Sequence, residues 1–398
     1  MRSICKPLAL ESGHYFREKG TKAEKIIHDL SIKTFFTDWC YPNPPRPGGK
    51  ELCDLLVVFD DTAIIWQIKD LRVDENGRYK QAEVDKNLRQ ISGARRTLFD
   101  IKSLVKLSNP RRGEELFDPS KIKKVHLISV LMGDGEGPFP FMDSIKEFKV
   151  HVFTRQFADI VLKELDTISD FTAYLAAKEA IAEKEIRIDG GEENLLGKYL
   201  HAGRTFDWMK NYDIIMIDDT IWPAIQKKPE FIAKKKLDQV SYGWDSMIDR
   251  AHEGSSHYER VARELARPDR FTRRVLSESF YEAYRELVSS NHEMLRRYMP
   301  VGDTTYCFFI TNDDEYPSPR RQEMLSLMCQ VARGLPPMNK RVIGVATGKS
   351  NRSHDFVHLY AESWSDADEQ RKQVIQEEYG IFVTPRITSS DADEYPKI

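Results

Sequence analysis

The sequence is poor in cysteine and lacks any pattern that would pair its thiols. Its 398 residues include five widely scattered cysteines and no CxxC motif. An odd, scattered set argues against a disulfide scaffold and against a structural cysteine–zinc site, and it favours a reducing compartment. The five are Cys5, Cys40, Cys53, Cys307 and Cys329.

Long apolar runs are absent as well. No stretch approaches the roughly 20 consecutive apolar residues that a membrane-spanning helix needs. Residues 1–20 interrupt a short apolar run with several polar side chains, which is unlike a secretory signal: Glu11, His14, Arg17 and Glu18. We therefore expect a soluble, cytoplasmic protein that has no membrane partner.

Neither sign of charge predominates over the whole chain, whose formal net charge is −3. The charges are unevenly placed, however. Residues 86–124 hold eleven Lys and Arg against four acids, whereas residues 361–398 hold nine acids against four bases. Exposed charges more than about 8–10 Å apart are largely screened, so a partner responds to the local patch. The basic segment is compatible with phosphate binding, although a solvated helix face would give the same count.

The length predicts two or three domains at about 100–200 residues each. Residues 1–165 alternate between helical and strand-like patterns, and residues 166–299 are mostly helical. Residues 300–398 return to alternation in the order βαββα, which predicts a small second α/β domain with a sensing or binding role. Strand-like runs lie at 305–311, 341–346 and 355–360, and helical patterns lie at 320–334 and 366–379.

The pattern of residues 1–165 predicts a mixed sheet with helices on both faces. A helix at 21–36 precedes two β-branched runs, 52–59 and 62–69, separated by two residues as in a tight hairpin. Short apolar runs at 125–131 and 148–153 predict buried strands. Between the hairpin and these runs, an apolar stripe with three- and four-residue spacing predicts an amphipathic helix: Val84, Leu88, Ile91, Ala94, Leu98, Ile101 and Val105.

Three polar side chains interrupt the predicted hairpin. Gln67 and Lys69 lie two residues apart on one strand, so they point to the same face. With a turn at Asp60-Asp61, position 54 of the partner strand pairs with about position 67. Cross-strand partners have Cβ atoms roughly 4.5–5.5 Å apart. The sequence therefore predicts that Asp54, Gln67 and Lys69 converge.

A divalent metal is one reason to bury such groups together. Mg²⁺ or Mn²⁺ takes oxygen ligands, commonly one or two carboxylates with waters and substrate phosphate. Asp54 offers a carboxylate, Gln67 an amide oxygen and Ile68 its backbone carbonyl. Lys69 would then orient a water nucleophile or offset charge on a phosphorane. A buried Asp54–Lys69 ion pair with a hydrogen-bonded Gln67 explains the same spacing without any activity.

This arrangement resembles the PD-(D/E)XK nuclease superfamily, whose signature is an aspartate on one hairpin strand and (D/E/Q)-x-K on the next. Gln67-Ile68-Lys69 is similar to the QxK variant of Mrr-like restriction endonucleases, with Cys53 at the position of the eponymous proline. The resemblance covers roughly residues 15–155. It implies a restriction-endonuclease-like αβββαβ core and a metal-dependent phosphodiesterase, most naturally acting on DNA and plausibly in bacterial defence.

The resemblance also implies an acid on the first helix, and Glu24 is the matching position. It would be a further metal ligand and catalytic residue. Thr21-Lys-Ala-Glu24 equally fits a helix capping box, in which Glu24 accepts a hydrogen bond from the Thr21 N–H. Both interpretations stay open from the sequence.

Polar residues of the amphipathic helix are candidates for substrate contacts. Lys86 and Gln90, four residues apart, lie beside the apolar stripe, and in similar enzymes such residues approach the phosphate or a metal-bound water. Arg89, Arg95 and Arg96 are candidate phosphate contacts. An ordinary solvated helix flank has the same composition.

Two other functions fit the sequence. Because Gln67 lacks the acid's charge, a catalytically silent nucleic-acid-binding or assembly module could retain the fold. RNA could also replace DNA as substrate. Double-strand cutting would need two active sites or sequential nicks, so a homodimer or an activating partner protein is also expected.

Overall fold

The computed structural model describes most of the chain. The described residues are 21–46, 49, 51–71, 73–100, 104–133, 135, 141–145, 148–254, 258–315, 318–349, 353–385 and 392–397. Two compact units form: unit 1 comprises Met1–Asp166 and Phe171–Trp222, and unit 2 comprises Thr167–Asp170 and Pro223–Ile398. Residues 166–299, the expected helical middle region, are divided between these units. No helix in the described ranges is long and apolar enough to cross a membrane.

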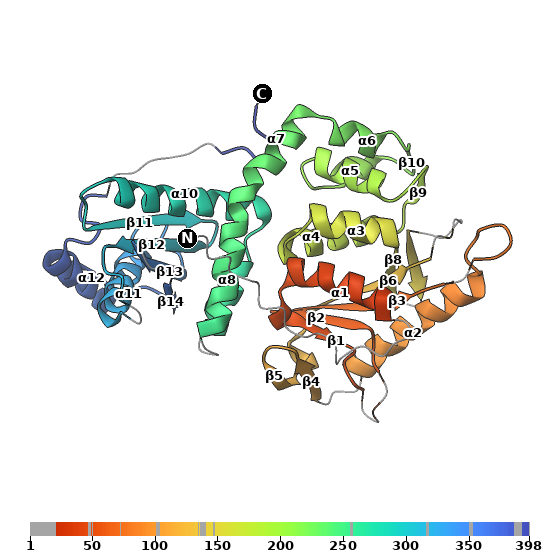
Figure 1. The fold of residues 1–398 in the computed structure, drawn as a ribbon, viewed down its shortest axis with the longest axis horizontal. Coiled ribbons are helices and arrows are strands. Elements are labelled where there is room, and N and C mark those ends of the chain that lie inside the picture. Colours follow the sequence, from red (N-terminus) through yellow and green to blue (C-terminus); the bar gives the residue numbers. More distant parts are fainter. Residues whose placement is uncertain are drawn as a thin grey trace, which may run out of the picture. The chain divides into compact units, whose positions relative to one another are not determined.

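Unit 1 is built on a six-stranded mixed sheet with the order β1-β2-β3-β6-β8-β7 (Figure 1). Strands β3, β6 and β8 run parallel, whereas β1–β2, β2–β3 and β7–β8 are antiparallel pairs. The strands are β1 (Cys40–Pro42), β2 (Leu55–Phe59), β3 (Thr62–Lys69), β6 (Lys124–Leu131), β7 (Met142–Ile145) and β8 (Phe148–Thr154).

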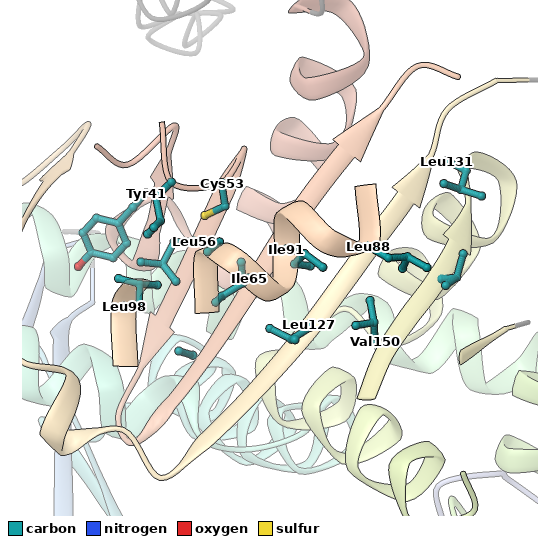
Figure 2. Packing of buried hydrophobic residues seen from close by; sticks show 14 of the residues in the cluster. Tyr41, Cys53, Leu56, Ile65, Leu88, Ile91, Leu98, Leu127, Leu131 and Val150 are labelled. Carbon is teal, nitrogen blue, oxygen red and sulfur yellow. The ribbon is translucent and has the colours of Figure 1, made fainter. Parts of the chain in front are cut away.

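One face of this sheet is covered by α2 (Gln81–Phe99). Leu88 and Ile91 of the helix pack on Ile65 and Leu127 of the central strands, within a continuous buried cluster (Figure 2). Alternation along each strand sends the neighbouring side chains to the opposite face. The apolar stripe of α2 therefore packs against the sheet as its spacing predicted, as far as Leu98.

The opposite face packs against helices α1 (Thr21–Phe35), α3 (Arg155–Glu164) and α4 (Ile168–Ala180). Trp66 is fully buried here, stacked on Phe171 of α4 with ring centroids 5.7 Å apart. Phe35 of α1 meets Phe171 edge to face at 5.2 Å. This aromatic cluster joins the sheet to α1 and α4.

Smaller elements complete unit 1. They are two short hairpin strands, a two-stranded parallel sheet and the connecting helices: η2 (Thr37–Trp39), β4 (Val105–Asn109), β5 (Gly113–Phe117), η3 (Pro119–Lys121), β9 (Glu185–Ile188), α5 (Glu193–His201), η4 (Asp207–Asn211), β10 (Ile214–Ile217) and α6 (Ile221–Gln226), whose last residues fall in unit 2. Val105 begins β4 instead of continuing the amphipathic helix, which ends at Phe99, and Ile101 lies outside the described residues.

Unit 2 contains a four-stranded sheet with the order β11-β12-β13-β14. Its strands β12 and β13 are parallel and joined through α11, and β11 and β14 flank them in antiparallel pairs. The elements are α7 (Pro229–Leu237), η5 (Asp238–Ser241), α8 (Tyr242–Gly254), α9 (Glu259–Ala266), α10 (Arg270–Ser289), β11 (Met294–Val301), β12 (Thr304–Thr311), α11 (Pro319–Arg333), β13 (Arg341–Gly348), β14 (His354–Tyr360) and α12 (Asp366–Tyr379).

The mixed α/β class is confirmed, with one added strand in unit 2. The order β12-α11-β13-β14-α12 matches the predicted βαββα pattern. The structure adds β11 before it, where the sequence predicted helix. β11 is half-buried along its length and contains Arg296, Arg297 and Pro300, so it carries no clear alternation of apolar and polar residues.

Candidate active site

The hairpin turn sets the position of Asp54. Asp60 has a φ of +51°, and Phe59 pairs with Thr62, so the turn has two residues as expected. Leu55 pairs with Trp66, and just before β2 the Asp54 N–H donates to the same Trp66 carbonyl oxygen at 3.1 Å. Asp54 itself lies just before the paired residues of β2, and the contact between its side chain and that of Gln67 brings positions 54 and 67 together as expected.

Asp54 is tightly held and 8% exposed. Its Oδ2 accepts hydrogen bonds from the Gln67 amide at 2.6 Å and from the Ile68 N–H at 2.5 Å. The Asn43 N–H donates to the Asp54 carbonyl oxygen at 3.0 Å, which ties the residue to the chain after β1. Ile68 thus contacts Asp54 through its N–H, and its carbonyl stays a predicted ligand only.

A cleft of about 690 Å³ opens beside these residues, between the ends of β2 and β3 and helix α2. Asp54, Gln67 and Lys69 line its strand side. Six of the ten residues predicted for the site line this cleft: Asp54, Gln67, Lys69, Arg89, Gln90 and Arg96. These six residues bring an acid, two amides, an amine and two guanidinium groups to the cleft.

Burial and neighbouring charges raise the pKa of Asp54 to about 6. Desolvation is the largest cause, and the carboxylates of Glu24 and Glu51 add to it. The Ile68 N–H and the Lys69 charge act in the opposite direction. Asp54 is thus a carboxylate whose ionised form the protein alone does not fully stabilise, as expected where a cation completes the site.

Glu24 belongs to the same electrostatic group. Burial first, and the charge of Glu51 second, raise its pKa, whereas the charge of Lys69 lowers it. Glu24 is half-buried near the start of α1. The helix begins at Thr21, whose side chain lies outside the described part, so the capping-box alternative stays untested.

Lys69 is half-buried at the end of β3. In the ranges that the structure describes, no group lies within hydrogen-bond or ion-pair distance of its ammonium. The direct Asp54–Lys69 ion pair, the inactive interpretation of this spacing, is therefore absent from these ranges. The ammonium is available to a water molecule or a phosphate in the cleft.

The predicted substrate contacts on α2 fall into two groups. Arg89, Gln90 and Arg96 are exposed and line the cleft, whereas Lys86 is exposed outside it. Arg95 points elsewhere: its guanidinium lies 3.7 Å from the centre of the Phe148 ring and 3.9 Å from Asp100. Arg95 therefore contributes to packing between α2 and β8.

Three charged residues of the cleft are not among the residues predicted for the site: Arg46, Glu51 and Asp100. Arg46 and Glu51 lie in the loop between β1 and β2, and Asp100 follows the last residue of α2. Loop residues have no periodicity that would assign them to a face. The one sequence feature that could have indicated a site residue is the position of Glu51, three residues before Asp54.

The donor set fits a hard divalent cation such as Mg²⁺ with an incomplete protein shell. Asp54, Glu24 and Glu51 supply carboxylates and Gln67 an amide, all oxygen ligands of the kind Mg²⁺ and Mn²⁺ prefer. These carboxylates do not bring three ligand atoms within 4.8 Å of one another. Waters and a substrate phosphate would have to fill the remaining positions, as is usual for Mg²⁺.

Comparisons with protein-family models, curated proteins and solved structures find no match to this chain.

Proposed function

We propose that unit 1 is a metal-dependent nuclease domain of the PD-(D/E)XK type that hydrolyses phosphodiester bonds, most naturally in DNA. The observation that carries this proposal is the shared cleft of Asp54, Gln67 and Lys69, in which the lysine has no internal partner among the described groups. A buried acid with a raised pKa beside a free ammonium is an arrangement that costs stability. Such groups are concentrated at functional sites.

The element order supports the same assignment. The chain runs α1–β1–β2–β3–α2–β6, with the extra β4–β5 hairpin between α2 and β6. This order fits an αβββαβ core with the site at the ends of β2 and β3. The basic flank of α2 lies across the cleft from these ends, where a substrate backbone would need positive charge.

The proposed mechanism assigns each group one task. Asp54, with Glu24 and Gln67 as further ligands, would hold the Mg²⁺ or Mn²⁺ ion, which lowers the pKa of bound water and polarises the phosphate. Lys69 orients the attacking water and offsets charge that develops on the phosphate oxygens. Arg89 and Arg96 hold flanking phosphates.

A catalytically silent nucleic-acid-binding module is the second candidate. One observation favours it: the Gln67 amide donates to Asp54 Oδ2, so that pair satisfies itself without a metal. In this alternative the cleft binds a phosphate backbone through its arginines, and no bond is cut.

Plasmid cleavage with Mg²⁺ and with Mn²⁺ distinguishes the two. Wild-type protein, Asp54→Ala and Lys69→Ala are compared, with Arg95→Ala as a control outside the cleft. The nuclease proposal predicts metal-dependent cutting by wild type and Arg95→Ala, and none by the other two. Equal behaviour of all four proteins would favour the silent module.

The same variants on RNA test the substrate class. Cutting of RNA but not of plasmid DNA, lost in Asp54→Ala, would assign an RNA-directed nuclease. Bacterial defence, a homodimer and an activating partner protein remain proposals that follow from the family resemblance and from the need for two cuts.

A further inference from the structure

Two buried histidines and a glutamate meet on the face of the unit 1 sheet opposite α2. His126 lies on β6 and His151 on the adjacent parallel strand β8, where it pairs with Ile128. Their sequence neighbours Leu127 and Val150 pack in the cluster beneath α2, so alternation directs both imidazoles away from α2. Glu179, from the last turn of α4, lies over them.

One carboxylate oxygen joins both rings. Glu179 Oε1 lies 2.8 Å from His126 Nδ1 and 3.0 Å from His151 Nε2. The three potential ligand atoms lie within 4.8 Å of one another, and no other group of three such side chains does so in the described ranges. Ligands at 2.0–2.1 Å from a tetrahedral zinc ion are about 3.3 Å apart. The two distances from Glu179 Oε1 to the imidazoles would lengthen by only a few tenths of an ångström to admit an ion.

The protonation states suit a metal. Burial lowers the pKa of His151 to about 4, so this imidazole is neutral at pH 7. Burial alone would raise the pKa of Glu179, but hydrogen bonds with the two rings lower it to about 2, so the carboxylate is ionised. Metal ligation requires neutral imidazole and ionised carboxylate.

Hydrogen bonds alone leave this cluster poorly satisfied. In the metal-free state both rings donate to the same oxygen, and the far nitrogens His126 Nε2 and His151 Nδ1 are buried without a partner. An ion bound at the inner His126 Nδ1 and His151 Nε2 would leave these far nitrogens as N–H groups, so the case for an ion rests on the two rings that share one oxygen. Coordinate bonds to an ion would supply stabilisation that two hydrogen bonds to one oxygen do not.

The nearest buried cation does not occupy this position. Lys178 precedes Glu179 on α4, and its charge contributes to the low pKa of His151. Its ammonium is held by Glu192 at 2.5 Å and by the Phe141 carbonyl oxygen at 2.8 Å. The lysine charge is therefore balanced within its own pair.

We propose that His126, His151 and Glu179 bind one divalent transition-metal ion of the zinc class, which ties β6 and β8 to α4. Imidazole nitrogen favours zinc, copper, iron or nickel over Mg²⁺. Glu179 is 28% exposed, so water can complete the coordination from that side. Because the cluster lies on the sheet face opposite α2, it is separate from the cleft beneath that helix. The spacing in the sequence does not predict this cluster, because positions 126, 151 and 179 belong to three different elements.

Elemental analysis and Co²⁺ substitution test the proposal. All proteins carry Asp54→Asn, which removes the acid proposed to bind Mg²⁺, and are purified full-length without chelator. The test variants are His151→Ala and Glu179→Gln. His252→Ala is the matched control, because His252 is also bonded to a glutamate, Glu259, at 3.1 Å, and in the part of the chain that the structure describes the two belong to no group of three potential ligands.

The proposal predicts about one zinc-class ion per chain in the parent and in His252→Ala, visible d–d bands after Co²⁺ loading, and loss of both in the test variants. Glu179→Gln keeps a hydrogen-bond acceptor, so a folded variant that loses the ion separates ligation from stability. Added Zn²⁺ should raise the unfolding temperature of the parent but not of Glu179→Gln. A parent protein with no bound ion, no Co²⁺ bands and an unfolding temperature indifferent to Zn²⁺ would overturn the proposal.

Discussion

Neighbouring carboxylates repel one another on the strand side of the cleft. Three carboxylates, Glu24, Glu51 and Asp54, influence one another, and burial with mutual repulsion raises the pKa of two of them. Lys69 contributes one positive charge but bonds to none of them directly within the described ranges. A divalent ion would relieve this repulsion and leave Lys69 to the substrate.

Replacing Lys69 by alanine should abolish cutting and leave metal affinity largely intact. The ammonium acts on water and phosphate in the proposed mechanism, and it is not a ligand. Plasmid cleavage measures the first effect, and calorimetric titration with Mg²⁺ or Mn²⁺ measures the second. Loss of metal binding in Lys69→Ala would count against the role assigned here.

Asp54→Asn should weaken metal binding and yet stabilise the metal-free fold above about pH 6. Folded Asp54 keeps its proton up to a pKa of about 6, whereas the unfolded side chain loses it near 4. Stability of the wild type therefore falls as pH rises from about 4 to 6, and the penalty persists above that window.

Asparagine does not titrate. At pH 7.5 in EDTA, the free energy of unfolding of Asp54→Asn should therefore exceed that of the wild type by about 1–3 kcal/mol. The difference should shrink to nothing below about pH 4. Urea denaturation at the two pH values checks this. A variant that is less stable than wild type at pH 7.5 would contradict the assignment of strain to Asp54.

Glu51 should affect metal binding although no motif includes it. It lines the cleft and raises the pKa of both Asp54 and Glu24. Glu51→Gln should weaken Mg²⁺ binding by roughly tenfold, about 1.4 kcal/mol, because one nearby negative charge is lost. Glu75→Gln, an exposed acid that does not line the cleft, is the control, and equal affinities in the two variants would exclude a role for Glu51.

At the scale of elements, α2 has two functional faces. Its apolar stripe holds the sheet, and its polar flank closes the cleft. The basic segment that contains it is partly used internally. Arg111 binds Asp38 at 2.8 Å and Arg112 binds Glu115 at 2.7 Å. The charge available to a substrate from this segment is therefore smaller than the sequence count suggests.

Arg89→Ala and Arg96→Ala should each weaken DNA binding and reduce the slope of log K against log salt by about 0.9 per lost phosphate contact. Arg95→Ala should leave the slope unchanged and lower stability by about 1 kcal/mol, because its guanidinium packs on Phe148. Anisotropy titrations at several salt concentrations, in Ca²⁺ to prevent cutting, measure both. If the salt slope changed in Arg95→Ala and in neither of the other variants, Arg95 would be the phosphate contact, and Arg89 and Arg96 would not.

Periodic elements were predictable and loops were not. The hairpin register and Thr62–Lys69 followed from alternation and a two-residue turn, and they placed Asp54 beside Gln67 correctly. Arg46 and Glu51 lie in a loop, where position depends on tertiary contacts. β9 and most of β11 lie in the region predicted to be mostly helical, where the shortness of β9 and the lack of clear alternation in β11 give no strand signal.

At the scale of the whole molecule, unit 1 extends beyond the predicted boundary at residue 165. Phe171 of α4 stacks on the fully buried Trp66, and Glu179 contacts His126 and His151. Residues 171–222 therefore complete one face of the sheet that carries the candidate site. They belong to unit 1.

Truncation tests this boundary. A chain that ends at Trp222 should fold cooperatively, whereas one that ends at Asp166 should lose fixed aromatic packing, because Trp66 and its neighbours become exposed. Removing a large buried aromatic side chain alone costs about 3–5 kcal/mol. Near-ultraviolet circular dichroism and urea unfolding measure this. A cooperative, native-like 1–166 fragment would contradict the extended boundary.

The most direct test of the central claim is the position of a bound metal. Crystals of the full chain soaked in Mn²⁺ should give an anomalous peak in the cleft, in direct contact with the Asp54 carboxylate and close to Gln67. The peak should disappear in Asp54→Asn and persist in Lys69→Ala. The absence of a peak in the cleft at saturating Mn²⁺, or a peak that persists in Asp54→Asn, would contradict the proposal that Asp54 binds a metal ion there.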